Sequence, residues 1–190
     1  FRGEFYVDSG DISADGYDDI IVGSGNGSPN GHVVFFDGKR LLDKNAPAEN
    51  NYKQEGSVRA SLYAFIGYSS GVAVRLANMN GDKYADIILG PGTGAGTVTA
   101  SHLRVWDGQL SMAQFENGVP FSSYNYKEWE LASFWAFGSD DAPGGGLSLS
   151  IIHQADRDWI VASQLFGPGI KTFSYQAGLN GMLHLEQDLT

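Results

Sequence analysis

The strongest constraint on this chain is a repeat, because a sequence that recurs at a fixed period builds its fold from copies of one unit. The stretch Asp11–Gly23 (Asp-Ile-Ser-Ala-Asp-Gly-Tyr-Asp-Asp-Ile-Ile-Val-Gly) is matched in register by Asn78–Gly90 (Asn-Met-Asn-Gly-Asp-Lys-Tyr-Ala-Asp-Ile-Ile-Leu-Gly). Three later markers recur in the same order: a glycine-rich turn, an aromatic strand and another apolar strand, at Gly23–Gly25, His32–Gly38 and Ala60–Phe65, then at Gly90–Gly92, His102–Gly108 and Ala132–Phe137. Together they indicate a unit of roughly 70 residues.

A third copy is degenerate. Gly146–Leu149 matches Gly71–Val74, and Asp158–Val161 aligns with Asp86–Leu89. The turn Gly167–Gly169 and the strand Lys171–Tyr175 follow, but the loop before Asp158 is shorter and lacks the acidic pattern. Met182–Leu185 is interpreted as an incomplete last strand.

The predicted fold is all-β. Alternating stretches such as Val72–Arg75 fit half-buried strands, and the apolar run Ile20–Val22 fits a fully buried one. Each unit should contain four short strands, and no window predicts a helix; Leu41–Lys53 and Pro120–Asn125 are expected to be long loops. The 190 residues divide into units 1–70, 71–145 and an incomplete 146–190, or about 2.7 units of roughly 70 residues.

The loop motif Asp-x-Ser/Asn-x-Asp-x-Tyr-x-Asp followed by Ile-Ile-x-Gly, with the later Val-x-Phe/Trp-Asp-Gly strand, resembles FG-GAP (VCBS-type) repeats of bacterial surface or secreted proteins. These repeats are related to the β-propeller blades of integrin α-chains. The resemblance covers nearly the whole chain and implies blades of four antiparallel strands, with calcium held between the first two strands. Asn78 in place of a carboxylate, Lys83 in place of a glycine, and the third loop depart from the family pattern.

Calcium takes six to eight oxygen ligands, and alternate residues of a tight loop can supply them. The candidates are Asp11, Ser13, Asp15, Tyr17 (through its carbonyl) and Asp19 in the first loop, and Asn78, Asn80, Asp82, Tyr84 and Asp86 in the second. Three converging carboxylates would repel without a cation; the alternative is an acidic turn capped by its own amides. We expect weaker binding at the second loop, because only Asp82 and Asp86 are charged ligands there. Lys83 also adds a positive charge nearby and is expected to take an unfavourable positive φ. Magnesium is disfavoured because it demands near-octahedral geometry.

Composition limits the other possibilities. The formal charge of −10 disfavours nucleic acid, whose phosphates require clustered Lys and Arg. No run of about 18 apolar residues predicts a membrane span. The chain has no cysteine, which excludes thiolate sites and disulfides. Because it begins at Phe1, it is expected to be either a processed product or a piece of a longer protein.

Possible catalytic motifs have simpler structural interpretations. Gly67–Gly71 fits G-x-S-x-G, but a strand-like segment follows it where a nucleophile elbow requires a helix. The glycine run Gly90–Gly96 does not match G-x-G-x-x-G. His32 and His102 hold one repeat position and are expected to be structural, whereas His153 and His184 are isolated. These observations predict no catalytic residues and no enzyme.

The tryptophans and one sequon suggest further roles in the core, in ligand binding or in modification. Trp106 and Trp135 are expected in the core, whereas Trp129 lies outside the repeat markers and is a candidate for exposure and sugar stacking. Asn26–Ser28 is a glycosylation sequon weakened by Pro29.

The predicted function is structural or adhesive work outside the cell, secreted or on the cell surface. Fewer blades than the four to eight of closed propellers suggest that the partners are further blades of a longer chain or other copies, as in a surface assembly or filament. Glycans or surface proteins are possible targets. One alternative is a calcium-dependent, lectin-like propeller, and another is the accessory propeller of a secreted enzyme.

Overall fold

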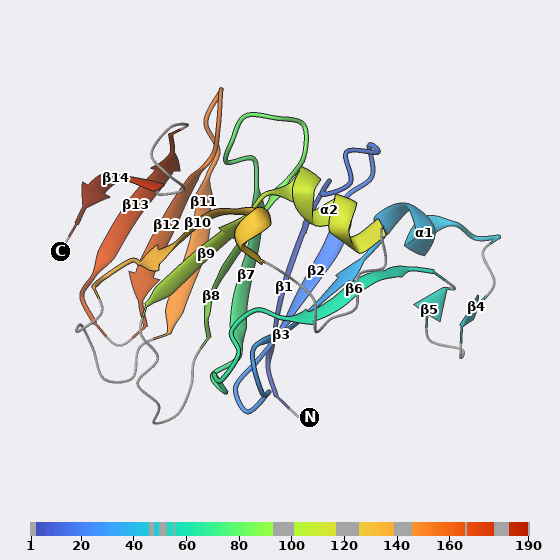
Figure 1. Ribbon diagram of the computed structural model, residues 1–190, viewed down its shortest axis with the longest axis horizontal. Helices are drawn as coiled ribbons and strands as arrows, with labels where there is room; N and C mark the ends of the chain where they lie inside the picture. Colours follow the sequence, from blue (N-terminus) through green and yellow to red (C-terminus); the bar gives the residue numbers. More distant parts are fainter. Residues whose placement is uncertain are drawn as a thin grey trace.

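The computed structural model describes residues 3–45, 48–49, 53–54, 56–92, 101–116, 126–138, 146–165, 167–176 and 183–189. Its described part is dominated by three four-stranded antiparallel sheets (Figure 1). In chain order the strands are β1 (Phe5–Gly10), β2 (Asp19–Ser24), β3 (His32–Phe36) and β6 (Val58–Tyr63); β7 (Val72–Ala77), β8 (Asp86–Pro91), β9 (His102–Trp106) and β10 (Glu130–Trp135); and β11 (Leu147–Ile152), β12 (Trp159–Gln164), β13 (Ile170–Tyr175) and β14 (Leu183–Asp188). The all-β prediction with four strands in a unit is confirmed.

The third sheet is complete, unlike the predicted partial unit. The segment interpreted as an incomplete strand continues to Asp188, and β14 pairs with β13 from Tyr175↔Leu183 to Lys171↔Asp188. The sheet therefore has the same number of strands as the first two.

The sheets lie side by side in chain order, with their first strands adjacent. β7 contacts β1 and β2, and β11 contacts β7 and β8. Glycine permits this close approach: a Cβ on Gly23 would overlap the backbone oxygen of Val72, and one on Gly146 would overlap that of Gly92. Backbone therefore meets backbone at both junctions.

Two apolar cores fill the junctions. Val72, Val74 and Leu76 of β7 pack toward the first sheet with Ile21 and Leu62, whereas Ile88 and Leu103 pack toward the third. Every residue of β8 is buried, because the second sheet has a neighbour on both faces. This double burial accounts for the continuous apolar run Ile87–Leu89.

Two helices contradict the prediction that the chain has none. α1 (Gly38–Leu42) and α2 (Gly108–Glu116) follow β3 and β9 directly. Asp37 accepts the backbone N–H of Arg40 at 2.7 Å, and Asp107 accepts that of Leu110 at 2.8 Å. The Asp-Gly pair, which the sequence pattern places at the end of a strand, is therefore a helix start, since an N-terminal aspartate satisfies amides that lack a helical partner.

The segments expected to be long loops are only partly loops. Leu41 and Leu42 belong to α1, and a small hairpin of β4 (Ala48–Glu49) and β5 (Lys53–Gln54) follows. The stretch Pro120–Asn125 lies outside the described residues, and the 3₁₀ turn Tyr126–Glu128 comes after it.

The tryptophan predictions were right for one residue of three. Trp106 is fully buried, but Trp135 is 40% exposed and Trp129 only 2%. Trp129 stacks on Trp106 at 5.9 Å between ring centroids and meets Phe115 of α2 edge-on at 5.7 Å. It is therefore a core residue and offers no surface for a sugar.

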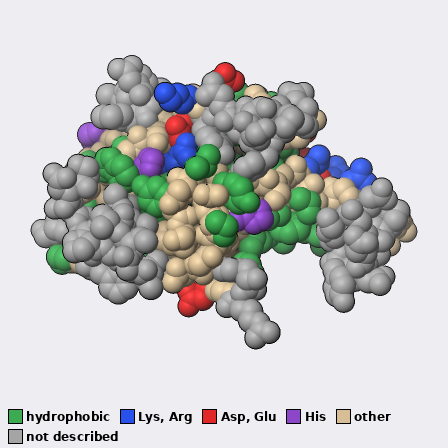
Figure 2. Space-filling model, turned by 60° about the horizontal axis from the view of Figure 1, so that its bottom comes forward, with side chains coloured by type: hydrophobic (Ala, Val, Ile, Leu, Met, Phe, Trp, Pro, Cys, Tyr) green, Lys and Arg blue, Asp and Glu red, His purple; other side chains and the backbone are tan. Residues whose placement is uncertain are grey.

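Among the described helices, none is both long and apolar enough to cross a membrane. On the face shown in Figure 2, hydrophobic side chains lie in several patches separated by other surface, with histidines beside them.

Candidate metal centre

The first candidate loop connects β1 to β2 and closes around the carboxylate of Asp11. Its oxygens accept the N–H groups of Asp15 at 3.0 Å and Gly16 at 2.9 Å, and Asp15 accepts the N–H of Tyr17 at 3.0 Å. Ala14 and Gly16 have φ of 55° and 86°, which reverses the chain within a few residues. The loop is thus tightly wound, as oxygen ligation of a small cation requires.

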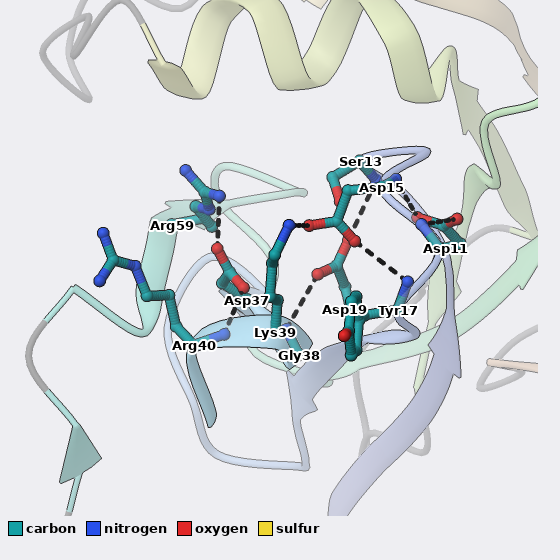
Figure 3. Close-up of polar contacts among 11 residues, drawn as sticks. Asp11, Ser13, Asp15, Tyr17, Asp19, Asp37, Gly38, Lys39, Arg40 and Arg59 are labelled. Carbon is teal, nitrogen blue, oxygen red and sulfur yellow. Dashed lines mark hydrogen bonds and ion pairs between the residues drawn. The ribbon is translucent and has the colours of Figure 1, made fainter. Parts of the chain in front are cut away.

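Asp19 connects this loop to the sheet behind it. Its two oxygens accept the N–H groups of Ser13 and Gly38, each at 3.0 Å, and its side chain lies close to those of Ser13 and Asp15 (Figure 3). Burial raises the pKa of its carboxyl group, although the hydrogen bonds from Gly38 and Ser13 act in the opposite direction. A nearby cation would favour the ionised form of this carboxyl group.

The second loop, between β7 and β8, has a similar set of hydrogen bonds from backbone N–H groups to side-chain oxygens. The side-chain oxygens of Asn78, Asn80 and Asp82 accept the N–H groups of Gly81 (2.8 Å), Asp82 (3.0 Å) and Tyr84 (2.7 Å). The two loops are therefore built alike, although in the second loop Asn78 replaces the carboxylate of Asp11 and Asn80 replaces the hydroxyl of Ser13.

Asp86 occupies the place of Asp19 and is more deeply buried. It accepts the N–H groups of Met79 at 2.8 Å and Gly108 at 2.9 Å. Burial raises the pKa of its carboxyl group to about 7, and the charges of Asp107 and Asp82 also raise it. Asp86 consequently stands in an electrostatic environment that a divalent cation would relieve.

The anticipated strain at Lys83 is not found. The second loop takes its positive φ at Gly81 (83°), the position equivalent to Ala14, and Lys83 is not among the described residues with positive φ. Lys83 instead places its ammonium 5.0 Å from the centre of the Tyr84 ring. The Lys83 side chain therefore affects the loop through its charge, without backbone strain.

The helix starts are the part of the site that the sequence did not predict. Gly38 donates its N–H to Asp19, and Gly108 donates its N–H to Asp86, so each candidate loop is tied to the first turn of a helix. Asp107 also accepts the side-chain N–H of Asn80 at 3.2 Å. The Asp-Gly pair after the aromatic strand is the sequence signal for these helix starts, because an aspartate followed by a helix can cap its first turn.

The third loop is related to the others by a different register from the predicted one. Trp159 opens β12 as Asp86 opens β8, and Asp158 donates its N–H to the carbonyl of Asn78 (2.8 Å) as Ala85 does to Asp11 (2.9 Å). Asp158 is thus equivalent to Ala85, not to Asp86, because the shorter loop shifts the alignment by one position. Its carboxylate accepts the N–H of Asn78 and contacts His153.

A polar pocket of about 570 Å³ adjoins the first loop. Lys39 lies 3.5 Å from Asp15, and Arg59 forms an ion pair with Asp37 (Figure 3). The lining of the pocket combines acidic and basic side chains with an exposed tyrosine: Asp15, Tyr17, Asp37, Lys39, Arg40 and Arg59. Such a wall can hydrogen-bond a polyhydroxylated ligand.

Whether these loops suit calcium depends on the kind of donor. In the described part of the chain, no three His, Asp or Glu side chains are arranged to hold a metal ion. Calcium, however, also takes hydroxyl, amide and carbonyl oxygens, which Ser13, Asn78, Asn80 and the two tyrosine carbonyls provide. These oxygen donors are of the kinds that calcium binds. A divalent cation at the second loop would also stabilise the buried negative charge of Asp86.

The remaining candidates have local structural roles. His32 and His102 each pair with a serine across their sheets, Ser61 at 2.8 Å and Ser133 at 2.9 Å. Ser69, the serine of the G-x-S-x-G pattern, is exposed, but strand β7 begins directly after Gly71, so Gly67–Gly71 lacks the strand–helix context of a nucleophile elbow. Asn26 is exposed in a turn.

Comparisons of the chain with protein-family models, curated proteins and solved structures found no match.

Proposed function

We propose that this chain is a non-catalytic, calcium-stabilised structural or adhesive module that works outside the cell, secreted or on the cell surface. Its sheets are proposed to be β-propeller blades of the FG-GAP type. The partners would be further blades of a longer chain or other copies, and the targets surface proteins or glycans.

The observation that carries the proposal is the shared construction of the two loops. In each, alternate side chains accept the loop's own amides, and the last aspartate is buried and receives an N–H from the start of a helix. In the first loop Asp11, Ser13, Asp15, Asp19 and the Tyr17 carbonyl would hold the ion; in the second Asn78, Asn80, Asp82, Asp86 and the Tyr84 carbonyl would. Bound calcium would offset the buried negative charge and fix the strand–loop–helix connection.

Calorimetry with and without a calcium chelator tests this proposal. An ion that binds only the folded state stabilises it by mass action, and we expect chelation to lower the melting temperature by several degrees. An unchanged melting temperature would count against both loops as calcium sites.

A calcium-dependent lectin is the second candidate, favoured by the pocket beside the first loop. Asp15 and Tyr17 line that pocket and belong to the candidate calcium loop, and calcium there would make ligand binding depend on the ion. Glycan binding that disappears on chelation, and also in the Arg59→Ala variant, would move this function ahead of a purely structural one.

A further inference from the structure

A second polar pocket, of about 300 Å³, lies against strands β12, β13 and β14 of the third sheet (Figure 1). Its volume is at the lower end of the range for small-molecule sites, about 300–1,000 Å³. We call it the third-unit pocket, and it is lined by Asp156, Arg157, Trp159, Ser174, Gln176 and Glu186. It shares no residue with either candidate calcium loop.

Strand register shows that this pocket is the counterpart of the one beside the first loop. Arg59 is the unpaired bulge residue of β6, and Glu186 is the unpaired bulge residue of β14. Each contacts the residue at the same position of the third strand in its unit. Arg59 forms an ion pair with Asp37 (Figure 3), and Glu186 accepts the hydroxyl hydrogen of Ser174. The two pockets therefore occupy the same place in their units.

The pocket beside the first loop shows that a following sheet leaves this place open. The second sheet docks on the first through β7, which contacts β1 and β2, and a pocket of about 570 Å³ nevertheless remains there. The third-unit pocket is therefore built by its own unit, and it does not depend on whether another sheet follows.

The third unit replaces residues that would hold calcium in the second. Trp159 opens β12 where Asp86 opens β8, and Arg157, two residues earlier, stands in the place of Tyr84. The guanidinium group of Arg157 donates an N–H to the carbonyl of Tyr175 at 2.7 Å, which fixes its position. A fixed positive charge repels a divalent cation, so a ligand of this pocket should bind without calcium.

The charges that line the third-unit pocket disfavour ionic ligands. Arg157 lies 3.3 Å from Asp156 and is paired with it, and Glu186 adds a second carboxylate, so an anion would meet net negative charge. The same guanidinium group disfavours a cation. A neutral ligand with hydroxyl groups suits the lining, because carboxylates accept several hydrogen bonds and the amide of Gln176 both donates and accepts.

Trp159 gives the pocket one apolar wall among these polar groups. Its side chain is partly exposed and lines the pocket. A sugar ring has the complementary surface, with an apolar face of C–H groups and a rim of hydroxyl groups. Small-molecule sites commonly combine an aromatic wall with a few polar groups that fix the orientation of the ligand.

We propose that the third-unit pocket binds one neutral sugar unit of a glycan without calcium. Trp159 packs on the ring, and Glu186 and Gln176 hydrogen-bond its hydroxyl groups. This inference deepens the proposed function and rests on it for its glycan targets. It differs from the lectin alternative at the first loop, where ligand binding depends on the ion.

Ligand-observed NMR with the full chain and the neutral monosaccharides glucose, galactose, mannose, fucose and N-acetylglucosamine tests the proposal. Tetramethylammonium and inorganic phosphate serve as charged probes. A sugar from this panel should bind in chelator with an affinity within about twofold of that in calcium, because the site is not linked to the ion. Neither charged probe should bind.

Three variants locate the binding. Trp159→Ala should weaken sugar binding about tenfold or more, because a tryptophan wall supplies much of the contact. The matched control is Trp135→Ala, which removes a 40% exposed tryptophan from β10, outside the pocket, and should bind as the wild type does. Glu186→Gln keeps an acceptor for Ser174 and should also weaken binding, since hydrogen bonds to a charged acceptor are stronger.

Four outcomes would overturn the proposal: no sugar of the panel binds, the two tryptophan variants lose equal affinity, binding requires calcium, or a charged probe binds in place of the sugars. Circular dichroism reports folding. If Trp159→Ala does not fold, wild-type affinity in Glu186→Gln overturns the proposal instead. Melting temperatures with and without chelator separate it from the calcium role. Stability that falls on chelation without sugar binding refutes only the pocket, whereas sugar binding with an unchanged melting temperature refutes only the calcium sites.

Discussion

Replacing Asp86 by Asn separates the cost of a buried charge from its use as a ligand. The pKa of the Asp86 carboxyl is raised from 3.8 to about 7, a difference of roughly 3 units at 1.36 kcal/mol each. Above pH 7 the ionised group therefore costs the metal-free fold about 4 kcal/mol. Asn keeps one acceptor oxygen and loses the other, which leaves the N–H of Met79 or Gly108 unpaired at a cost of about 1–3 kcal/mol.

We therefore expect Asp86→Asn to stabilise the metal-free protein at pH 8 by about 1–3 kcal/mol, because the relieved charge outweighs the lost hydrogen bond. Calcium at a hundred times its dissociation constant should stabilise the wild type by about 2.7 kcal/mol. The Asp86→Asn variant has lost a charged ligand, so calcium should raise its free energy of unfolding by much less. Its advantage should thus disappear or change sign in calcium.

Urea unfolding at pH 8, with chelator and with calcium, measures both quantities. Asp8→Asn is the matched control, because Asp8 also accepts a backbone N–H, from Leu76 at 2.8 Å, but lies outside both loops. Its effect should be the same in the two buffers. If Asp86→Asn also changes the unfolding free energy equally in both, Asp86 is not linked to calcium and the reasoning fails.

Two further predictions concern the loops and a histidine. Asp15→Ala should reduce calcium-dependent stability more than Asp82→Ala, because the first loop offers three carboxylates; equal calcium affinities by titration calorimetry would contradict this. Burial, together with the charge of Arg104, lowers the pKa of His102 from 6.5 to about 4. The stability that neutral His102 contributes to the fold is therefore fully present above pH 6.5 and is lost as the pH falls toward 4. His102→Gln should flatten this part of the urea-midpoint profile, and an unchanged slope between pH 7 and 4.5 would refute it.

The sequence predicted the strands well because their apolar patterns match how they are buried. Ile87–Leu89 is continuous because both faces of its sheet are covered, and the loop motif identified two turns of the same construction. The third unit was placed one residue out of register, because the alignment followed the aspartate at 158 and strand pairing follows the side chains that enter the core.

The helices and two tryptophans were missed for connected reasons. Gly38–Leu42 is too short to show a helical period, and the capping role of Asp37 becomes visible only with the Arg40 N–H in place. Because α2 is not predicted from the sequence, nothing in the sequence indicates what buries Trp129. In the structure, Phe115 of α2 packs against it. Trp135 and Tyr63 hold the same position on the edge strands of their sheets, where one side stays open, and both are partly exposed.

The glycine-lined junctions bear on how such a chain lengthens in evolution. A unit like the second carries both halves of the contact: Gly90 to receive the sheet that follows, and Val72 and Val74 to dock on the sheet before. Duplication of its coding segment would therefore add a sheet without the invention of a new core. The two junctions would differ in how much change they tolerate, because a Cβ on Gly23 would overlap the backbone oxygen of Val72, whereas a Cβ on Gly90 would meet only the side chain of Leu147 at 3.1 Å. Sequence drift between copies should therefore be easier at the second junction than at the first.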